Sequence, residues 1–137
     1  MLVSTKGRYA MQIMLDIAQN SNGDFVVLMD IANRQGISEK YLESIVVSLS
    51  RAGLLIAQRG RGGGYKLARA PEEYTAGEII RATEGPLAPV SCLKTGDNEC
   101  PKAAECQTLP LWEGLDRRMS EYLDSITLRD VVDGIVE

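Results

Sequence analysis

Three cysteines lie within fifteen residues in the stretch CLKTGDNECPKAAEC, at Cys92, Cys100 and Cys106, and the chain contains no histidine. Structural cysteines usually stand singly among apolar residues, whereas many of the residues between these three are polar or charged. A disulfide would use two of the thiols and leave one over. Because thiolates are soft ligands that suit zinc and iron–sulfur clusters, we interpret the stretch as a metal-binding loop.

The spacing of the cysteines leaves the metal and one ligand open. Structural zinc takes four ligands, most often from pairs spaced as CxxC, and neither interval here has that length. Iron–sulfur clusters also commonly use four cysteines, so another group must complete the site. A cluster with an incomplete set of thiolates should be labile, which suits a sensor better than an electron carrier. Since the ligands must be deprotonated and the loop is polar, we expect the loop to be disordered without metal.

A helix-turn-helix pattern occupies the stretch MDIANRQGISEKYLESIVVSL. Ala32 lets two helices cross closely, Gly36 supplies a tight turn, and Leu42 pins the second helix. The N-terminal residues of such a second helix face base edges in the major groove of DNA. The candidates for DNA contact, which include the N-cap Ser38, are Ser38, Glu39, Lys40, Tyr41, Glu43, Ser44 and Ser48. Two helices of this kind also pack together in proteins that never touch DNA, which is the alternative.

Glu43 is the most informative of these candidates. A carboxylate accepts a hydrogen bond from the cytosine amino group, but it is repelled by phosphate. An acid at this position should therefore weaken binding to the wrong DNA sequences. We predict that Glu43 reduces the number of DNA sequences that the protein binds. The alternative is a solvated acid on a helix surface.

A basic, glycine-rich hairpin follows the helix-turn-helix. The strand-like runs LLIAQ and YKLAR flank the tip RGRGGG, with Arg59 and Arg61 at the tip and Lys66 close to it. Glycine lets a backbone approach a phosphate closely, and guanidinium groups suit the narrow, negative minor groove. We therefore predict a wing whose Arg59 and Arg61 contact DNA; a solvated basic hairpin is the alternative. No Lys-Ser/Thr pair follows the glycines, so the tip is not a nucleotide-binding phosphate loop.

A long helix near the end of the chain carries an apolar seam with steps of three and four residues. Its members, which we predict to form a dimerisation face, are Trp112, Leu115, Met119, Tyr122 and Ile126. A plain core helix is the alternative. Because winged-helix proteins usually read half-sites in pairs, we predict a homodimer on a roughly palindromic operator in double-stranded DNA.

The periodicity and the capping residues together predict a mainly α fold with a small β-hairpin. The helices expected cover residues 4–20, 28–35, 38–52, 75–83, 109–126 and 128–135. We divide the chain into a winged helix-turn-helix DNA-binding domain (1–84), a cysteine-containing cluster-binding loop (85–108), and a long dimerisation helix with a short last helix (109–137).

The charge of the chain is divided unevenly between its halves. Residues 1–70 hold nine Lys/Arg against five Asp/Glu, a local charge of +4, and residues 71–137 hold six against fourteen, a local charge of −8. Positive charge thus falls on the half predicted to bind DNA. No apolar run is long enough for a membrane span, so we expect a cytoplasmic protein without a membrane partner. There is no histidine base and no nucleophile motif, so we expect no enzyme and no small-molecule substrate.

With these motifs in place, the sequence resembles the Rrf2 family of bacterial transcription regulators, and most closely its iron–sulfur cluster regulators. The resemblance runs from STKGRYAMQIMLDIA through QGISEKYLESIVVSLSRAGL, RGRGGGYKL and TAGEIIRATEG to LDSITLRDVVDG. It implies a homodimer with winged heads and DNA contacts around Tyr41, Glu43 and Arg59. It also implies that the three cysteines hold an iron–sulfur cluster, of the 2Fe–2S type in those regulators.

The sequence departs from the family at the fourth ligand. The iron–sulfur regulators place a histidine three residues after the third cysteine, where this chain has Leu109. Nitric-oxide-sensing members use an aspartate of the partner's first helix, where this chain has Arg8. The fourth ligand thus stays open between a group from outside the chain and Glu105, Gln107, Asp97 or Glu99.

The leading prediction for the function is a cluster-sensing repressor or dual regulator of iron–sulfur cluster biogenesis genes. A thiol-redox or zinc-sensing regulator that uses the same loop is the first alternative. An iron–sulfur electron carrier is the second, and the basic winged half disfavours it.

Overall fold

The computed structural model describes residues 3–94 and 100–136. Within these ranges the chain forms six helices and one antiparallel hairpin, as the sequence predicted. The elements are α1 (Thr5–Asn20), α2 (Leu28–Gln35), α3 (Glu39–Arg51), β1 (Leu55–Gln58), β2 (Gly64–Leu67), α4 (Ala76–Glu84), α5 (Leu109–Ser125) and α6 (Leu128–Asp133). Short 3₁₀ turns that the sequence analysis missed lie at Pro71–Glu73, Ser91–Leu93 and Ala103–Glu105.

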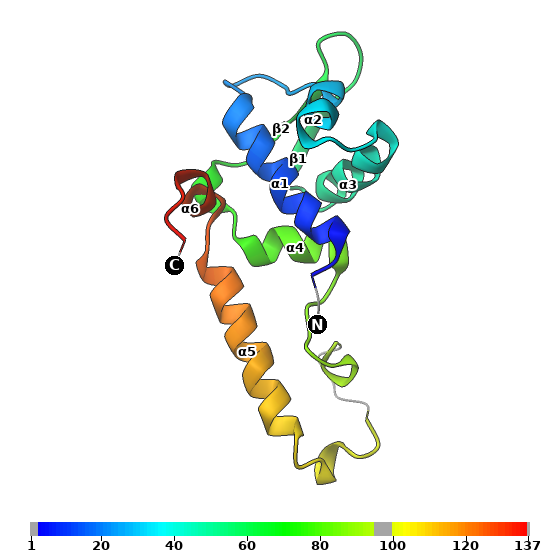
Figure 1. Ribbon diagram of the computed structural model, residues 1–137, viewed down its shortest axis with the longest axis vertical. Helices are drawn as coiled ribbons and strands as arrows, with labels where there is room; N and C mark the ends of the chain where they lie inside the picture. Colours follow the sequence, from blue (N-terminus) through cyan, green and yellow to red (C-terminus); the bar gives the residue numbers. More distant parts are fainter. Residues whose placement is uncertain (1–2, 95–99, 137) are drawn as a thin grey trace.

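The core of the protein forms around α1, which contacts α2, α3, α4, α6 and β2 (Figure 1). Ser4 begins this helix, because its hydroxyl accepts a hydrogen bond from the Gly7 N–H at 3.3 Å. Of its apolar residues, Ala10, Ile13, Met14 and Ile17 are buried, and Tyr9 and Ala18 are half-buried. The largest fully buried side chains are Tyr74, Ile13, Met14, Ile17, Ile31, Leu42, Ile45, Leu49, Leu54, Ile79, Leu128 and Val46.

The turn between α2 and α3 has the geometry that the sequence predicted. Gly36 lies in the left-handed region, with φ 66° and ψ 34°, where a residue with a Cβ is strained. The next N–H, of Ile37, donates to the Ala32 carbonyl at 3.2 Å and closes the end of α2. Ser38 then caps α3 by accepting from the Tyr41 N–H at 3.1 Å. The two helices therefore form a helix-turn-helix.

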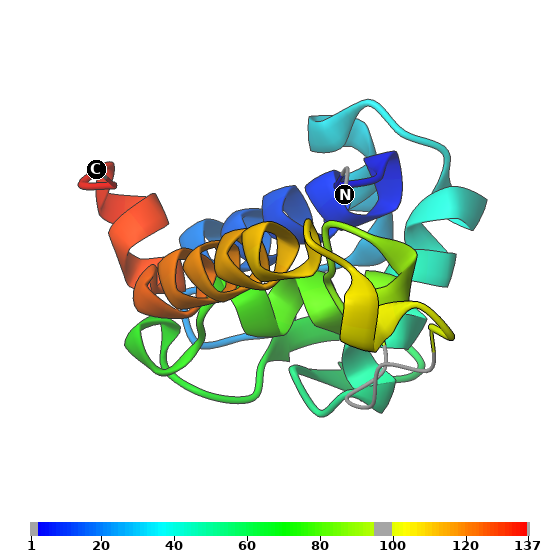
Figure 2. The same cartoon turned by 90° about the horizontal axis from the view of Figure 1, so that it is seen from below.

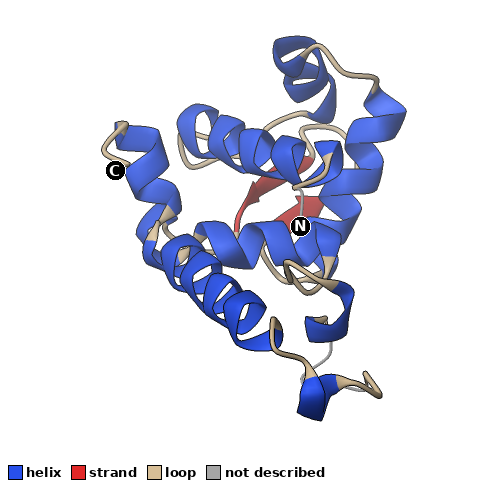
Figure 3. Ribbon diagram, turned by 60° about the horizontal axis from the view of Figure 1, so that its bottom comes forward, coloured by secondary structure: helices blue, strands red, loops and turns tan. Residues whose placement is uncertain are grey.

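The wing is a hairpin in which Leu55 pairs with Leu67 and Gln58 with Gly64. β1 packs against α3 and β2 against α1, so helices border the paired strands (Figure 3). Val26 joins the other edge of β2, where its N–H donates to the Tyr65 carbonyl at 2.7 Å.

Two wing glycines have a structural role that we had not predicted. A Cβ on Gly63 would clash with the Gln58 carbonyl, and a Cβ on Gly64 would clash with the Val26 carbonyl. Gly63 thus lets the chain pass close to the end of β1, and Gly64 lets β2 approach the segment at Val26.

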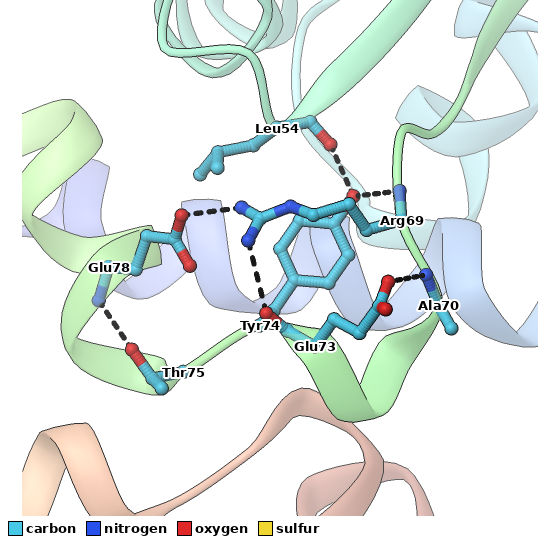
Figure 4. A network of polar contacts seen from close by, with 7 residues as sticks. All are labelled: Leu54, Arg69, Ala70, Glu73, Tyr74, Thr75 and Glu78. Atoms are coloured by element: carbon cyan, nitrogen blue, oxygen red, sulfur yellow. Dashed lines mark hydrogen bonds and ion pairs between the residues drawn. The ribbon is translucent and has the colours of Figure 1, made fainter.

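A network around Tyr74, which we call the Tyr74 joint, ties the wing to α4 (Figure 4). The ring is fully buried, and its hydroxyl donates to the Leu54 carbonyl at 2.7 Å and accepts from the Arg69 N–H at 2.9 Å. The Arg69 guanidinium lies over the ring, 4.4 Å from its centre, and forms an ion pair with Glu78 of α4. The end of the wing and the start of α4 are therefore held by one buried group.

α5 leaves the head and contacts it chiefly through α4 (Figures 1 and 2). No residue of α5 is buried. Arg81 of α4 donates to both carboxylate oxygens of Asp124, at 2.6 and 3.3 Å. A Cβ on Gly77 would meet the same carboxylate, so the Asp124 side chain would have to shift if this residue were larger. The alternative of a plain core helix is therefore wrong for the chain as a single subunit.

Candidate nucleic-acid interface and metal centre

The N-terminal half of α3 presents most of the predicted DNA contacts to solvent. The exposed ones are Ser38, Glu39, Lys40, Glu43 and Ser44. Two hydroxyls among them already have partners in the helix. Ser38 is the N-cap, and Ser44 donates to the Tyr41 carbonyl at 2.6 Å. The side chains of Glu39, Lys40 and Glu43 are therefore the best placed on α3 to reach a ligand.

Tyr41 and Ser48 are half-buried and connect α3 to α1. The Tyr41 ring meets the edge of the Tyr9 ring at 5.8 Å with an interplanar angle of 88°, a favourable aromatic geometry. Ser48 donates to the Ser44 carbonyl at 3.2 Å and accepts from the Lys6 ammonium at 3.3 Å. Ser48 thus serves helix packing, whereas Tyr41 is a partly exposed residue with a fixed ring.

A buried carboxylate that sequence reasoning missed orients the first helix of the helix-turn-helix. Asp16 of α1 is 4% exposed and accepts from Arg34 Nε at 3.0 Å and Nη2 at 2.7 Å, and from Gln35 Nε2 at 3.0 Å. The hydrogen bond to Asp16 raises the pKa of Arg34. An acid inside the apolar stripe, three residues after Ile13, was the signal that could have revealed this contact.

Arg59 and Arg61 are exposed on the wing, as predicted. Between the wing and α3 lies an open hollow of about 370 Å³, which we call the α3–wing hollow. Its lining residues are Glu43, Val47, Ser50, Arg51, Ala57, Gln58, Arg59 and Tyr65. The hollow is thus lined by both Glu43 of α3 and Arg59 of the wing, two residues that the sequence predicts to contact DNA.

Charged groups from α3 and from the wing both affect the pKa of Tyr65, which lines this hollow. Burial raises the pKa of the Tyr65 hydroxyl, the Glu43 carboxylate raises it further, and Arg59 lowers it. The hydroxyl therefore stays protonated and able to donate a hydrogen bond at neutral pH. The three side chains come from β2, α3 and the wing tip.

The three cysteines lie between α4 and α5. Cys92 is half-buried in the turn Ser91–Leu93, and Cys100 is exposed. Cys106 is half-buried beside the start of α5, with its Sγ 3.4 Å from the Thr108 Oγ1. Hydrogen bonds from the Thr108 hydroxyl, and then from backbone N–H groups, lower the pKa of the Cys106 thiol. Cys106 thus has more thiolate character than an ordinary cysteine.

The chemistry of this donor set fits a soft metal or an iron–sulfur cluster, because all three thiols are at least partly accessible. Their arrangement is not that of an assembled site. In residues 3–94 and 100–136, no three Cys, Asp or Glu side chains are grouped so that they could hold a metal ion. Binding would therefore have to draw the cysteines together.

The candidates for the fourth ligand are only partly placed. Glu105 and Gln107 are exposed, whereas Asp97 and Glu99 lie outside the described residues. Leu109, where the family histidine is expected, is the first residue of α5. Disorder of the metal-free loop stays a prediction, because its central segment, residues 95–99, also lies outside the described ranges.

The predicted dimerisation face of α5 is partly exposed in the single chain. Leu115 is 41% exposed and Tyr122 48%, while Trp112, Met119 and Ile126 are half-buried. Leu111, which is 62% exposed, extends this apolar surface at the start of the helix. We call these six residues the α5 face. Leu111, Leu115 and Tyr122 thus leave apolar side chains exposed along α5, a feature common at interaction sites.

Comparison with known proteins decides the family. A family model described as "Rrf2: Iron-dependent Transcriptional regulator" matches residues 3–134. The chain belongs to the Rrf2 family. The HTH-type transcriptional regulator IscR of Aliivibrio salmonicida is 39% identical over 132 residues, which cover 96% of this chain and 77% of that relative.

Solved structures of Rrf2 regulators are similar to this chain as well. CymR, the global cysteine regulator of B. subtilis, matches with a TM-score of 0.78 and 38% identity, over 97% of both chains. IscR of T. potens matches with a TM-score of 0.73 and 38% identity, over 98% of this chain and 88% of that one. The winged helix-turn-helix and the resemblance stated from the sequence are thus confirmed.

The Rrf2 relatives are transcription regulators and not enzymes, so the chain is a DNA-binding regulator, as the sequence predicted. No helix in the described part of the chain has the length and apolar character to cross a membrane. The chain resembles both IscR and CymR, so its own residues must indicate what it senses.

Proposed function

We propose that this Rrf2 chain is a homodimeric transcription regulator that senses iron–sulfur status through a cluster on Cys92, Cys100 and Cys106. The position of the cysteines carries this proposal. They lie in the segment that joins α4, part of the DNA-binding head, to α5, which has no buried residue in the single chain. A cluster bound there would lie beside α5, the helix that we expect to join the DNA-binding domains of two subunits.

The exposed α5 face supports the homodimer. Two copies related by a two-fold axis would bury the same apolar surface on each subunit. Such a dimer presents two α3 helices and two wings to a roughly palindromic operator in double-stranded DNA. Arg59 and Arg61 would then contact the minor groove beside each half-site, with Ser38, Glu39, Lys40, Tyr41, Glu43 and Ser44 over the major groove.

Three thiolates and one further ligand would hold the cluster, which is of the 2Fe–2S type by resemblance to the iron–sulfur regulators. When bound, the cluster supplies a redox-active and labile group, and the accessible thiols leave it open to oxidants. A regulator whose state depends on a cluster is suited to control the supply of clusters. We therefore infer that its targets are iron–sulfur cluster biogenesis genes.

The test is anaerobic purification followed by an absorption spectrum, iron and sulfide analysis, and measurement of DNA binding. Visible absorption with near-equal iron and acid-labile sulfide, lost on Cys→Ala at any of the three positions, is the expected result. Cluster loss should also change the affinity for operator DNA. A protein that stays colourless after anaerobic reconstitution would sink the cluster proposal and leave the DNA-binding function intact.

A thiol-redox regulator is the second candidate, and Cys106 favours it. Its thiol has a lowered pKa and is partly accessible, which are the properties of reactive cysteines. The chain also resembles CymR, a global cysteine regulator. In this case mild peroxide should change the DNA affinity of the metal-free protein, and a thiol reductant should restore it. Zinc analysis would distinguish a zinc-sensing regulator from the cluster sensor and from the thiol-redox regulator.

A further inference from the structure

The α3–wing hollow has the size and the polar groups of a binding site that the predicted DNA contacts do not explain. Its volume of about 370 Å³ is that of a small ligand pocket. Arg51, at the end of α3, and Arg59, from the wing, supply two positive charges to its lining, and both residues are exposed. Glu43 is the acid of that lining.

The position of Glu43 leaves room for an anion. Glu43 and Arg51 are eight residues apart on α3, which is about 12 Å along a helix that rises 1.5 Å per residue. The two backbone positions therefore lie at opposite ends of the α3 wall of the hollow, whose two guanidinium groups outnumber its one carboxylate. An anion at the Arg51 end is therefore attracted more strongly than it is repelled.

Two neutral groups of the hollow are suited to the same anion. The Ser50 hydroxyl is buried and is without a hydrogen-bond partner in the described structure. Buried polar groups are normally satisfied, so an orphaned one calls for an explanation. The Tyr65 hydroxyl is protonated at neutral pH and lies on the opposite wall, in β2. The Ser50 Oγ exposes less than 1 Å², so its side chain must turn toward the hollow before a bound oxyanion can accept from a hydroxyl of either wall.

We infer that the α3–wing hollow receives one phosphate of the DNA backbone, held by Arg51 with the Tyr65 and Ser50 hydroxyls. This inference rests on the proposed DNA-binding function. A recognition helix enters the major groove and a basic wing the adjoining minor groove. The backbone that separates these grooves must then pass between α3 and the wing, where the hollow lies. Arg51, Tyr65 and Ser50 are thus backbone contacts in addition to the residues predicted from the sequence.

The first test compares Arg51→Gln with Arg129→Gln, which removes the same charge from α6. Each is measured by DNA affinity as a function of salt, on an operator duplex selected by the wild-type protein. Losing one phosphate contact lowers the salt slope by about one unit per contact. We expect Arg51→Gln to show this change with an affinity loss of about tenfold, as for a hydrogen bond to a charged group. Arg129→Gln should leave both quantities unchanged.

Tyr65→Phe is the second variant, because it removes a donor without changing charge or shape. It should lower affinity several-fold and leave the salt slope unchanged. It also keeps the inference testable should Arg51→Gln weaken the last turn of α3, which thermal melting would reveal. Equal behaviour of Arg51→Gln and Arg129→Gln, with Tyr65→Phe like wild type, would overturn the inference.

Replacement of single phosphates by neutral methylphosphonates identifies the occupant of the hollow. One position in each half-site should weaken wild-type binding and have little effect on Arg51→Gln. If the two effects add at every position, no backbone phosphate sits beside Arg51. If millimolar inorganic phosphate at constant ionic strength displaces DNA from wild type but not from Arg51→Gln, the hollow binds free phosphate and the DNA assignment is wrong.

These outcomes separate the inference from the function on which it rests. Wild-type protein that binds duplex DNA with a steep salt dependence supports the regulator whatever the variants do. Wild-type protein that binds no duplex DNA would defeat the proposed function itself.

Discussion

Asp16→Asn should destabilise the protein far more than the same change in an exposed ion pair. The Asp16 carboxylate is 3% exposed and its partner Arg34 is 39% exposed. Asn keeps the shape of the side chain but removes the charge, and it points an amide N–H₂ at donors of Arg34 or Gln35. A buried group would thereby lose at least one hydrogen bond and face an unfavourable donor–donor contact.

The size of the effect follows from the burial of each partner. Removing one member of a fully buried pair costs about 3–5 kcal/mol. Because Arg34 can turn its guanidinium toward water, we reduce the expected cost to about 2 kcal/mol. Each kcal/mol lowers the Tm of a domain of this size by roughly 4 °C, so the expected fall is about 8 °C.

Asp124→Asn is the matched control, since Asp124 also receives two hydrogen bonds from one arginine, Arg81. Here the carboxylate is 47% exposed, and such surface pairs contribute about 0.2–1 kcal/mol. Urea unfolding followed by circular dichroism, at one protein concentration, measures both variants. If the two cost the same, or if Asp124→Asn cost more, burial does not decide the strength of these pairs and the reasoning fails.

Three further predictions concern the wing, site choice and the cysteine loop. Gly63→Ala should distort the wing and lower DNA affinity at least tenfold without unfolding the helices, because its Cβ meets the Gln58 carbonyl; unchanged affinity would show that the wing adapts. Glu43→Ala should bind more sequences than wild type when duplexes are selected from a random pool, and binding of fewer would contradict the site-narrowing role. Thr108→Val should raise the pKa of Cys106 in metal-free protein, because it removes the largest cause of the lowered value. Since the thiolate is the nucleophile, the pH midpoint of Cys106 alkylation should move upward; an unchanged midpoint would contradict that hydrogen bond.

The helices were predictable because their signals are local. Ser38, Thr75 and Thr127 each stand before an apolar periodic run, and each accepts a hydrogen bond from an N–H three residues later. Caps and periodicity depend only on neighbours in the sequence. The same holds for Gly36, whose turn follows from the absence of a Cβ.

What the sequence could not reveal are contacts between residues far apart in the chain. Asp16 and Arg34 are separated by 18 positions, Leu54 and Tyr74 by 20, and Arg81 and Asp124 by 43. Each joins polar groups whose partner depends on how whole elements pack. The α3–wing hollow escaped prediction for the same reason, since α3 and β2 form it together.

A cluster on the cysteine loop would lie far from the DNA-binding surface that it regulates. The segment just before α5, which carries the third cysteine, and the loop between β1 and β2 lie toward opposite ends of the long axis (Figure 1). Within one chain, α5 reaches α4 through the Arg81–Asp124 pair and through the hydrogen bond between the Ala76 N–H and the Ile126 carbonyl at 2.8 Å, and the Tyr74 joint ties α4 to the wing. Tyr74 is fully buried and its hydroxyl both donates and accepts. Because its hydrogen bonds are all made in this conformation, the Tyr74 joint favours a single arrangement of the wing and α4. A conformational switch needs two arrangements of similar free energy.

We therefore predict, on the proposed function, that the cluster acts across the dimer and not within one chain. Leu115→Glu places a charge on the α5 face, where Leu115 is 41% exposed, and should give a folded monomer. With and without the cluster, this monomer should bind a single half-site with the same affinity, while the wild-type dimer distinguishes the two states on a full operator. A monomer whose half-site affinity still depends on the cluster would place the switch inside the chain, and the Tyr74 joint would then have to adopt a second arrangement.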